Sequence, residues 1–159
     1  MNGLATPAKR WRRWPWETWA GGLIVAAALT AYHNSFGGPF VFDDLPSILD
    51  NPSIRSLWPL TTPLSPPNDF GFTVSGRPLV NLSLAFNYAI GGTAVWSYHV
   101  FNLVVHVLAG RALFGLVRRT LRQPVCTGWF DETRARAAAL SAAVLWTVHP
   151  LQTQAVTYV

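Results

Sequence analysis

"WSYHVFNLVVHVLAGRALFGLV" (residues 96–117) decides the fold of this chain, because it is apolar over a length that can cross a membrane. A transmembrane helix needs about 20 predominantly apolar residues. Arg111 is the one Lys, Arg, Asp or Glu in the stretch, and it lies near the end at which Arg118 and Arg119 follow. A long arginine side chain near the end of a span can reach the lipid headgroups. The stretch therefore predicts a transmembrane helix over residues 96–117.

Two more apolar stretches flank this segment. "WETWAGGLIVAAALTAYHNSF" predicts a first transmembrane helix over residues 15–36, since no charged residue follows Glu17 until Asp43 and tryptophans gather at its start. The small residues of "AAALTA" leave a cleaved signal peptide as the alternative. "RAAALSAAVLWTVHPLQTQAVTYV" predicts a third helix and the start of the next outer segment over residues 136–159. The expected fold class is an all-α membrane protein with about three transmembrane helices.

The distribution of charge predicts the orientation and argues against a nucleic-acid groove. The net charge is +5, but nine of the twelve basic residues lie in two patches, residues 9–13 and 118–136, each beside an apolar stretch. Basic residues that flank membrane spans remain in the cytosol. Residues 1–14 are therefore expected to form a cytosolic basic tail and residues 118–135 a cytosolic basic loop, with residues 37–95 outside. Cys126 is the only cysteine, so an internal disulfide is excluded.

The outer loop is too long and too patterned to be a simple connection. Prolines in its first half prevent a long helix there. "RPLVNLSLAFNYAIGG" then predicts an amphipathic helix over about residues 78–90, because Pro78 suits a first helical turn and the two glycines suit a stop. Its apolar residues recur at helical spacing, opposite Asn81 and Tyr88: Leu79, Leu82, Phe86 and Ile90. The helix lies either on the outer membrane surface or against other loops, and its "NLS" matches a glycosylation sequon.

An acidic pair opens the same loop, in "PFVFDDLPSILDNPSI" (residues 39–54). Asp43 and Asp44 are adjacent like charges about ten residues beyond the first predicted span. Such a pair tends to raise the pKa of one partner, and a carboxylate near lipid can accept a proton. A solvated turn or a helix cap is the alternative for the pair.

Polar residues also lie inside the predicted spans. His99, Asn102 and His106 are spaced by three and four residues, so they share one helical face. They suit hydrogen bonds between helices, contacts to a substrate or lipid phosphate, or a metal. The two histidines are about two turns apart, which argues against one ion bridging them. In the third segment, the His149–Pro150 pair predicts a helix break whose freed carbonyls need partners.

Four segments, "FVFDDLPSILDNPSI", "GRPLVNLSLAFNYAIGG", "YHVFNLVVH" and "HPLQTQAVTYV", together resemble a known family. In this order and spacing they resemble the N-terminal membrane part of the transmembrane-and-tetratricopeptide-repeat O-mannosyltransferases and their bacterial relatives. These enzymes belong to the GT-C superfamily of glycosyltransferases. The resemblance covers about residues 15–159 and implies a partial GT-C bundle in an integral membrane protein, with the bacterial inner membrane as the expected location.

The resemblance implies transfer of a sugar, with mannose the first candidate, from a polyprenyl-phosphate carrier to an acceptor hydroxyl on a protein or glycan outside the cytosol. Asp43 matches the general base of the family, and Asp44 would position it or the acceptor. Arg77, in "RPL", would bind the lipid phosphate or anchor the loop helix. Four further residues match family positions and are expected to bind substrate: His99, Asn102, His106 and His149. No cofactor is implied beyond the lipid-linked sugar, which is the substrate, and a divalent metal stays an alternative.

Two departures from the family pattern bear on activity. Gln154 stands where the family commonly has Glu, which removes an acid or ion-pair partner. The sequence also includes about three spans and no repeat of about 34 residues, whereas the family has more helices followed by repeats. We therefore expect a fragment that is inactive without the missing helices and repeats. The competing hypotheses are a non-catalytic membrane anchor or assembly subunit of a tetratricopeptide-repeat protein, and a small transporter segment.

Overall fold

The computed structural model describes residues 16–68 and 73–158. Within these ranges it contains helices and turns and no strand, so the predicted all-helical fold class is confirmed. The α-helices are α1 (Trp16–Tyr32), α2 (Pro78–Gly91), α3 (Val95–Leu121), α4 (Glu132–Thr147) and α5 (Thr153–Thr157). Short 3-10 turns at His33–Gly37, Pro52–Ile54, Pro124–Cys126 and Pro150–Gln152, and a π-helical turn at Leu45–Leu49, connect them.

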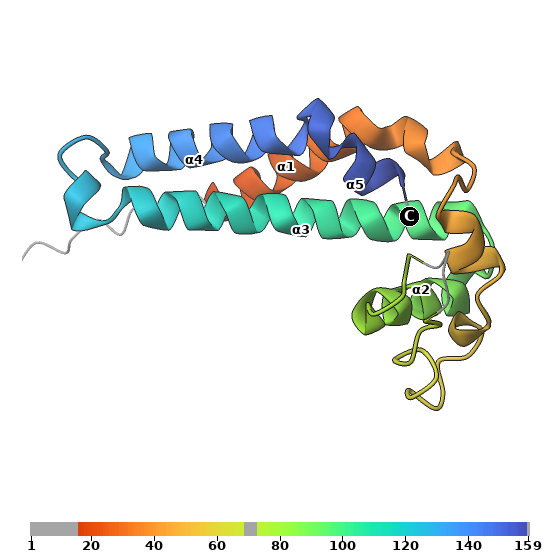
Figure 1. The fold of residues 1–159 in the computed structure, drawn as a ribbon. Helices are drawn as coiled ribbons and strands as arrows, with labels where there is room; N and C mark the ends of the chain where they lie inside the picture. Colours follow the sequence, from red (N-terminus) through yellow and green to blue (C-terminus); the bar gives the residue numbers. More distant parts are fainter. Residues whose placement is uncertain (1–15, 69–72, 159) are drawn as a thin grey trace, which may run out of the picture.

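Helices α1, α3 and α4 lie side by side, and α2 packs with the loop segments at the far end of α3 (Figure 1). Helix α3 has 27 residues and a mean hydropathy of 1.9 over its most apolar window, so it is long and apolar enough to cross a membrane. In the described ranges no other helix meets that test. Helix α1 ends at Tyr32 and α4 at Thr147, so each covers only part of the predicted spans 15–36 and 136–159. Membrane crossing by these two segments stays a prediction.

Small residues allow the three helices to approach closely. On α4 they recur every fourth residue and are fully buried: Ala135, Ala139, Ala143 and Thr147. On α3, a Cβ added at Gly110 would lie 2.7 Å from the Thr147 Oγ1 atom and 3.2 Å from the Ile24 Cγ2 atom. Close packing of small residues is how helices associate where lipid removes the hydrophobic driving force. Gly110 is therefore required where α1, α3 and α4 meet.

The outer surface of this bundle is apolar. Each helix exposes leucines over much of their surface, among them Leu23 (53%), Leu108 (58%), Leu116 (64%) and Leu145 (67%). Exposed apolar residues in this number on one helical bundle indicate a region that binds another apolar medium or partner. The bundle thus has small residues in its interior and apolar residues on its exterior, as expected for helices that pack in lipid.

The loop between α1 and α3 forms a second unit with its own core. That core consists of buried residues from four parts of the chain: Ile48, Ile54, Val74, Leu84, Ala85 and Tyr98. The predicted amphipathic helix is present as α2, which ends at Gly91. The next residue, Gly92, has a positive φ of 58°, and its N–H donates to the Tyr88 carbonyl. Tyr98 belongs to α3, so this core attaches the loop unit to the start of α3.

Helix α2 turns its apolar stripe outward. Leu79 (75%), Phe86 (50%) and Ile90 (60%) are exposed, whereas Asn81 is fully buried. The Asn81 Nδ2 atom donates to the Ser53 Oγ atom and to the Pro63 carbonyl, both at 2.8 Å, and its Oδ1 atom accepts from the Asn51 Nδ2 atom at 2.8 Å. The face of α2 that carries Asn81, Leu84 and Ala85 therefore packs on the loop, and the face that carries Leu79, Phe86 and Ile90 is exposed. Because Asn81 is buried and bonded at both amide atoms, it is not accessible as a glycosylation site in this fold.

Candidate functional site

The two aspartates lie in a tight turn between α1 and the π-helical turn Leu45–Leu49. Phe42, just before them, has a φ of 46°, in the left-handed region that residues other than glycine rarely adopt, and the residue is 81% exposed. The turn is closed by the Asp44 N–H, which donates to the Val41 carbonyl at 3.1 Å. Strained backbone of this kind concentrates at functional sites. The acidic pair is therefore held by a specific backbone geometry and not by a solvated coil.

The structure gives the two carboxylates different environments. The Asp44 side chain is buried, with 3% exposed, and its Oδ2 atom accepts the Val41 N–H at 3.0 Å. Asp43 is exposed, and no residue in the described ranges donates to its carboxylate. Asp44 fixes the turn, and Asp43 is presented to whatever medium or substrate lies outside it.

Arg77 is brought to the same unit by a short link. The Ser47 and Thr73 hydroxyls are 2.6 Å apart, which fastens the turn after the aspartates to the turn before α2. The Arg77 N–H donates to the Val74 carbonyl at 2.9 Å, and Arg77 then precedes the first turn of α2. Its side chain is exposed and makes no ion pair with the part of the chain that is described. A free cation and a free carboxylate thus project from one packed unit.

An apolar groove of about 520 Å³ lies between α2, the segment 57–60 and α3. Leu79, two residues after Arg77, lines the groove together with Phe86. Trp58, 78% exposed, and Phe101 of α3 complete its walls. The groove can bury an apolar chain while its charged end stays near the start of α2.

His99 lies where the acidic loop and the C-terminal segment meet α3. It is buried, with 1% exposed, and its Nδ1 atom is 3.4 Å from the Val156 carbonyl. A carbonyl only accepts, so Nδ1 carries the proton of this hydrogen bond. The Nε2 atom is buried and has no hydrogen-bond partner in the described part of the chain. It lies beside Gly38, where a Cβ would lie 3.6 Å from it. A buried polar atom without a partner calls for an explanation, and here it lies next to the loop that carries the aspartates.

Asn102 holds the same C-terminal segment one turn further along α3. Its Nδ2 atom donates to the Tyr158 carbonyl at 2.6 Å. On the opposite side of the junction, the Phe40 ring packs edge-on against Tyr98 with 5.4 Å between ring centroids. The structure therefore places His99 and Asn102 where the start of α3 contacts both the acidic loop and the C-terminal segment.

His106 and His149 lie at the break between α4 and α5. The His106 Nε2 atom donates to the Thr147 carbonyl at 2.9 Å, and its ring stacks on Trp146 with 4.9 Å between ring centroids. The Tyr32 hydroxyl donates to the same carbonyl at 3.1 Å. His149 is exposed, and its Nδ1 atom accepts the Leu151 N–H at 3.2 Å. The helix break predicted at His149–Pro150 is present, and these side chains supply the partners that its freed backbone groups need.

Some features of the site escape sequence reasoning. The network of Asn51, Ser53 and Asn81 joins residues up to 30 positions apart, and nothing local predicts that pairing. The Asn51–Pro52 pair does indicate a turn, and the Asn51 side chain accepts the Ser53 N–H at its start. A metal-binding group of three or more His, Cys, Asp or Glu is absent from residues 16–68 and 73–158.

Comparison with known proteins gives relatives but no family model and no solved structure that matches. The protein O-mannosyl-transferase TMTC3 of Mus musculus is 34% identical over 85% of this chain. The protein O-mannosyl-transferase Tmtc2 of Drosophila melanogaster is 37% identical over 84%, and the protein O-mannosyl-transferase F38B6.6 of Caenorhabditis elegans is 30% identical over 84%. The chain spans 14%, 14% and 19% of the length of these proteins. It is therefore homologous to one segment of proteins named as TMTC protein O-mannosyl-transferases.

Proposed function

We propose that this chain is part of an integral membrane glycosyltransferase of the TMTC type. The enzyme transfers a sugar from a polyprenyl-phosphate carrier to a protein hydroxyl on the non-cytosolic side. Mannose is the first candidate for that sugar. One observation carries the proposal: an accessible Asp43, without an ion-pair partner among the described residues, stands beside a buried Asp44, in a chain whose relatives are named O-mannosyl-transferases. The proposed location is the bacterial inner membrane, with the N-terminus in the cytosol.

In this proposal Asp43 accepts the proton of the acceptor hydroxyl. The acceptor oxygen forms a bond to the anomeric carbon of the sugar, and the bond between that carbon and the phosphate oxygen breaks. The polyprenyl phosphate departs with the bonding electron pair. A phosphate already leaves well, so the protein mainly activates the nucleophile and stabilises the separating charge. Asp44 acts as a positioning residue, because its carboxylate holds the turn that presents Asp43.

Arg77 and the groove beside α2 are proposed to hold the donor. A guanidinium binds phosphate through two parallel hydrogen bonds, and the N-terminus of α2, which Arg77 precedes, favours negative charge as well. The exposed apolar walls formed by Trp58, Leu79 and Phe86 suit the polyprenyl chain. Donor and base would then be held by one packed unit through the Ser47–Thr73 link.

The four remaining polar residues are proposed to act mainly through the segments that they hold. His99 and Asn102 bind carbonyls of the C-terminal segment, and His106 binds the end of α4. His149 accepts a backbone N–H of the following turn. Direct contact of these side chains with substrate stays a prediction. The unpartnered Nε2 atom of His99 is the strongest candidate for it.

The experiment that tests the function compares Asp43→Asn and Asp44→Asn with Asp50→Asn in the longest natural polypeptide that contains this chain. Asp50 is an exposed aspartate of the same loop, so it is a matched control. Loss of a general base is expected to slow transfer from polyprenyl-phosphate mannose about 10²- to 10⁴-fold. The Asp50 variant should keep wild-type transfer. If the Asp43 and Asp44 variants insert normally and also keep full transfer, the chain is a non-catalytic anchor or assembly subunit.

A further inference from the structure

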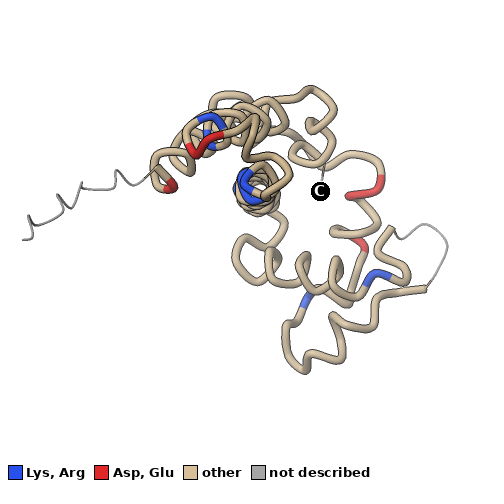
Figure 2. The backbone as a smooth tube through the Cα atoms, turned by 90° about the vertical axis from the view of Figure 1, so that its left-hand side faces the viewer, with Lys and Arg blue, Asp and Glu red and all other residues tan. Residues whose placement is uncertain are grey.

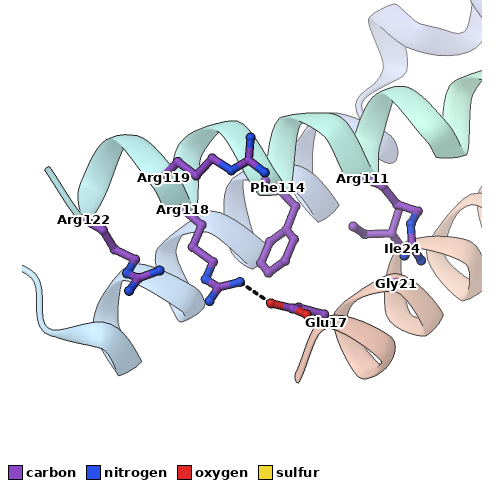
Figure 3. A pocket seen from close by; sticks show the side chains of 9 residues that line it. Glu17, Gly21, Ile24, Arg111, Phe114, Arg118, Arg119 and Arg122 are labelled. Atoms are coloured by element: carbon purple, nitrogen blue, oxygen red, sulfur yellow. Dashed lines mark hydrogen bonds and ion pairs between the residues drawn. The ribbon is translucent and has the colours of Figure 1, made fainter. Parts of the chain in front are cut away.

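A second pocket lies between α1 and α3, at the end of the bundle opposite the acidic loop (Figure 3). Its volume is about 390 Å³. Figure 2 looks along the bundle from this end, where the arginines of α3 gather. Four of them line the pocket: Arg111, Arg118, Arg119 and Arg122. Among the described residues, Glu17 is the one carboxylate in its wall.

The ion pairs at this end leave a surplus of positive charge. Arg118 pairs with Glu17 at 2.8 Å and with Glu132 at 3.1 Å, and Arg122 pairs with Glu132 at 2.6 Å. Arg111 and Arg119 have no carboxylate partner among the residues that the structure describes. The wall therefore carries two arginines whose charge is not neutralised within the pocket.

Hydrogen-bond donors in the pocket are also unused. The Nε atom of Arg118 is buried and has no hydrogen-bond partner within residues 16–68 and 73–158. The Arg111 guanidinium packs directly on α1 at Gly21, where a Cβ would occupy its place, so it is held at the inner end of the pocket. Arg111 and Arg118 are seven residues apart on α3, which corresponds to about 10 Å along the helix axis. The site thus presents two guanidinium groups along α3, one at the inner end of the pocket and one nearer the end of the bundle.

Apolar groups line the pocket between these charges. Ile24 of α1 and Phe114 of α3 face it (Figure 3). The same helices expose Leu23 and Leu116 over more than half of their surface. A ligand for this place needs an anionic head and an apolar body.

We propose that this pocket binds the headgroup phosphate of an anionic phospholipid, with an acyl chain along the apolar surface of α1 and α3. Arginine binds phosphate through its fixed fork of donors, and basic residues at the end of a membrane-capable helix attract anionic lipid. A zwitterionic headgroup is disfavoured, because its own cation meets the unneutralised arginines. The site is separate from the acidic loop, so it stands whether or not the chain takes part in sugar transfer.

The test measures lipid adducts on the purified chain by native mass spectrometry, with phosphatidylglycerol and phosphatidylcholine as probes. The wild type should bind phosphatidylglycerol preferentially. Arg119→Gln should lower that preference about fivefold, the effect of one arginine near a membrane surface. Arg134→Gln is the matched control, since Arg134 is also exposed at this end but lies outside the pocket, where it pairs with Asp131. It should leave the preference within about twofold of wild type.

A pair of glycine variants tests the inner end of the pocket. A Cβ at Gly21 meets the Arg111 guanidinium, whereas a Cβ at Gly22 meets nothing within 4 Å. Gly21→Ala should therefore lose preference for phosphatidylglycerol as Arg111→Gln does, and Gly22→Ala should not. Arg119 is exposed, so its variant remains informative if Gly21→Ala fails to fold.

Three results would overturn the proposal. The first is equal binding of phosphatidylglycerol and phosphatidylcholine by the wild type. The second is an equal loss of the preference for phosphatidylglycerol in Arg134→Gln and Arg119→Gln. That result would show that the net charge of the protein attracts the lipid and that no specific site binds it. The third is binding of inorganic phosphate without any phosphatidylglycerol adduct, which would show that the pocket takes the free anion and not a lipid.

Discussion

His106 on α3 donates its Nε2 proton to the backbone carbonyl of Thr147, 2.9 Å away, at the residue where α4 ends. A carbonyl at a helix end has no partner within its own helix, and this one is buried between helices. The Tyr32 hydroxyl of α1 reaches the same oxygen. One backbone atom therefore joins α1, α3 and α4 just before the chain turns back toward the start of α3.

Removal of the His106 side chain should destabilise this junction. His106→Ala leaves the Thr147 carbonyl with Tyr32 alone and opens space beside Trp146. We expect a loss of about 1–3 kcal/mol in the free energy of unfolding, measured by denaturant titration in detergent micelles. His149→Ala is the control, since that side chain is exposed and bonds within its own turn. An equal loss of unfolding free energy in both variants would show that the His106 contact does not stabilise the junction specifically.

The buried amide network predicts a second stability effect. Asn81→Ala removes three hydrogen bonds and leaves the Pro63 carbonyl and the Asn51 amide without that partner. Each buried group left unpaired costs about 1–3 kcal/mol, so the loop unit should become sensitive to protease at a lower temperature.

Ser83→Ala separates this structural role from glycosylation. It also destroys the "NLS" sequon, but the Ser83 hydroxyl bonds only to the nearby Val80 carbonyl. We expect Ser83→Ala to keep the protease resistance of the wild type. We also expect no glycan on Asn81 in the wild type or in Ser83→Ala. A mass increase on Asn81 in a glycosylating host would contradict the buried network.

The basic end of the bundle predicts a dependence of stability on pH. Burial acts to raise the pKa of Glu132, but the hydrogen bond from Arg118 and the charges of Arg136 and Arg122 outweigh it and hold that pKa below its ordinary value. Glu132 lies outside the predicted spans. A lowered pKa in the folded state means that the unfolded state binds more protons, so stability falls as the pH decreases.

This contribution should be complete above the ordinary glutamate pKa of about 4.3 and lost as the pH falls through the lower value of the folded state. The measurement is the unfolding midpoint in detergent across the acidic range. Glu132→Gln should be less stable at neutral pH and show a flatter decline, whereas Asp50→Asn should follow the wild type. The effect is modest, because the Glu132 side chain is 36% exposed. A Glu132→Gln profile that is parallel to the wild type would exclude this carboxylate as the cause.

Local signals predicted the elements that are fixed locally. Pro78 and the glycines at 91 and 92 predicted both ends of α2, because proline suits a first turn and glycine adopts a positive φ. Pro150 predicted the break after α4 for the same kind of reason. The side on which α2 would pack was not predictable, since a stripe of leucines does not say whether protein or lipid covers it. That choice depends on Asn51 and Asn81, which meet only in the folded loop.

The candidate site was predictable to a similar degree. Sequence reasoning found the acidic pair, but two adjacent aspartates look alike until the Phe42 turn buries one and exposes the other. It also placed His99 and His106 on one face of α3. Their partners, Val156 and Thr147, lie more than 40 residues away, so the chemistry of each histidine required the structure.

The proposed orientation predicts opposite labelling of two loops. Cys126 is the single cysteine, is free, and lies in the connection predicted to be cytosolic. A membrane-impermeant maleimide should therefore label it in inverted vesicles and not in sealed, right-side-out ones. In a Cys126→Ser background, Asp50→Cys places a thiol at an exposed position of the acidic loop and should give the reverse pattern. Because one helix, α3, connects the loop unit to the connection that holds Cys126, it must cross the bilayer for the two patterns to differ. Labelling of both cysteines from the same side would place the acidic loop and the arginine pocket in one compartment, and α3 would then not be a transmembrane helix.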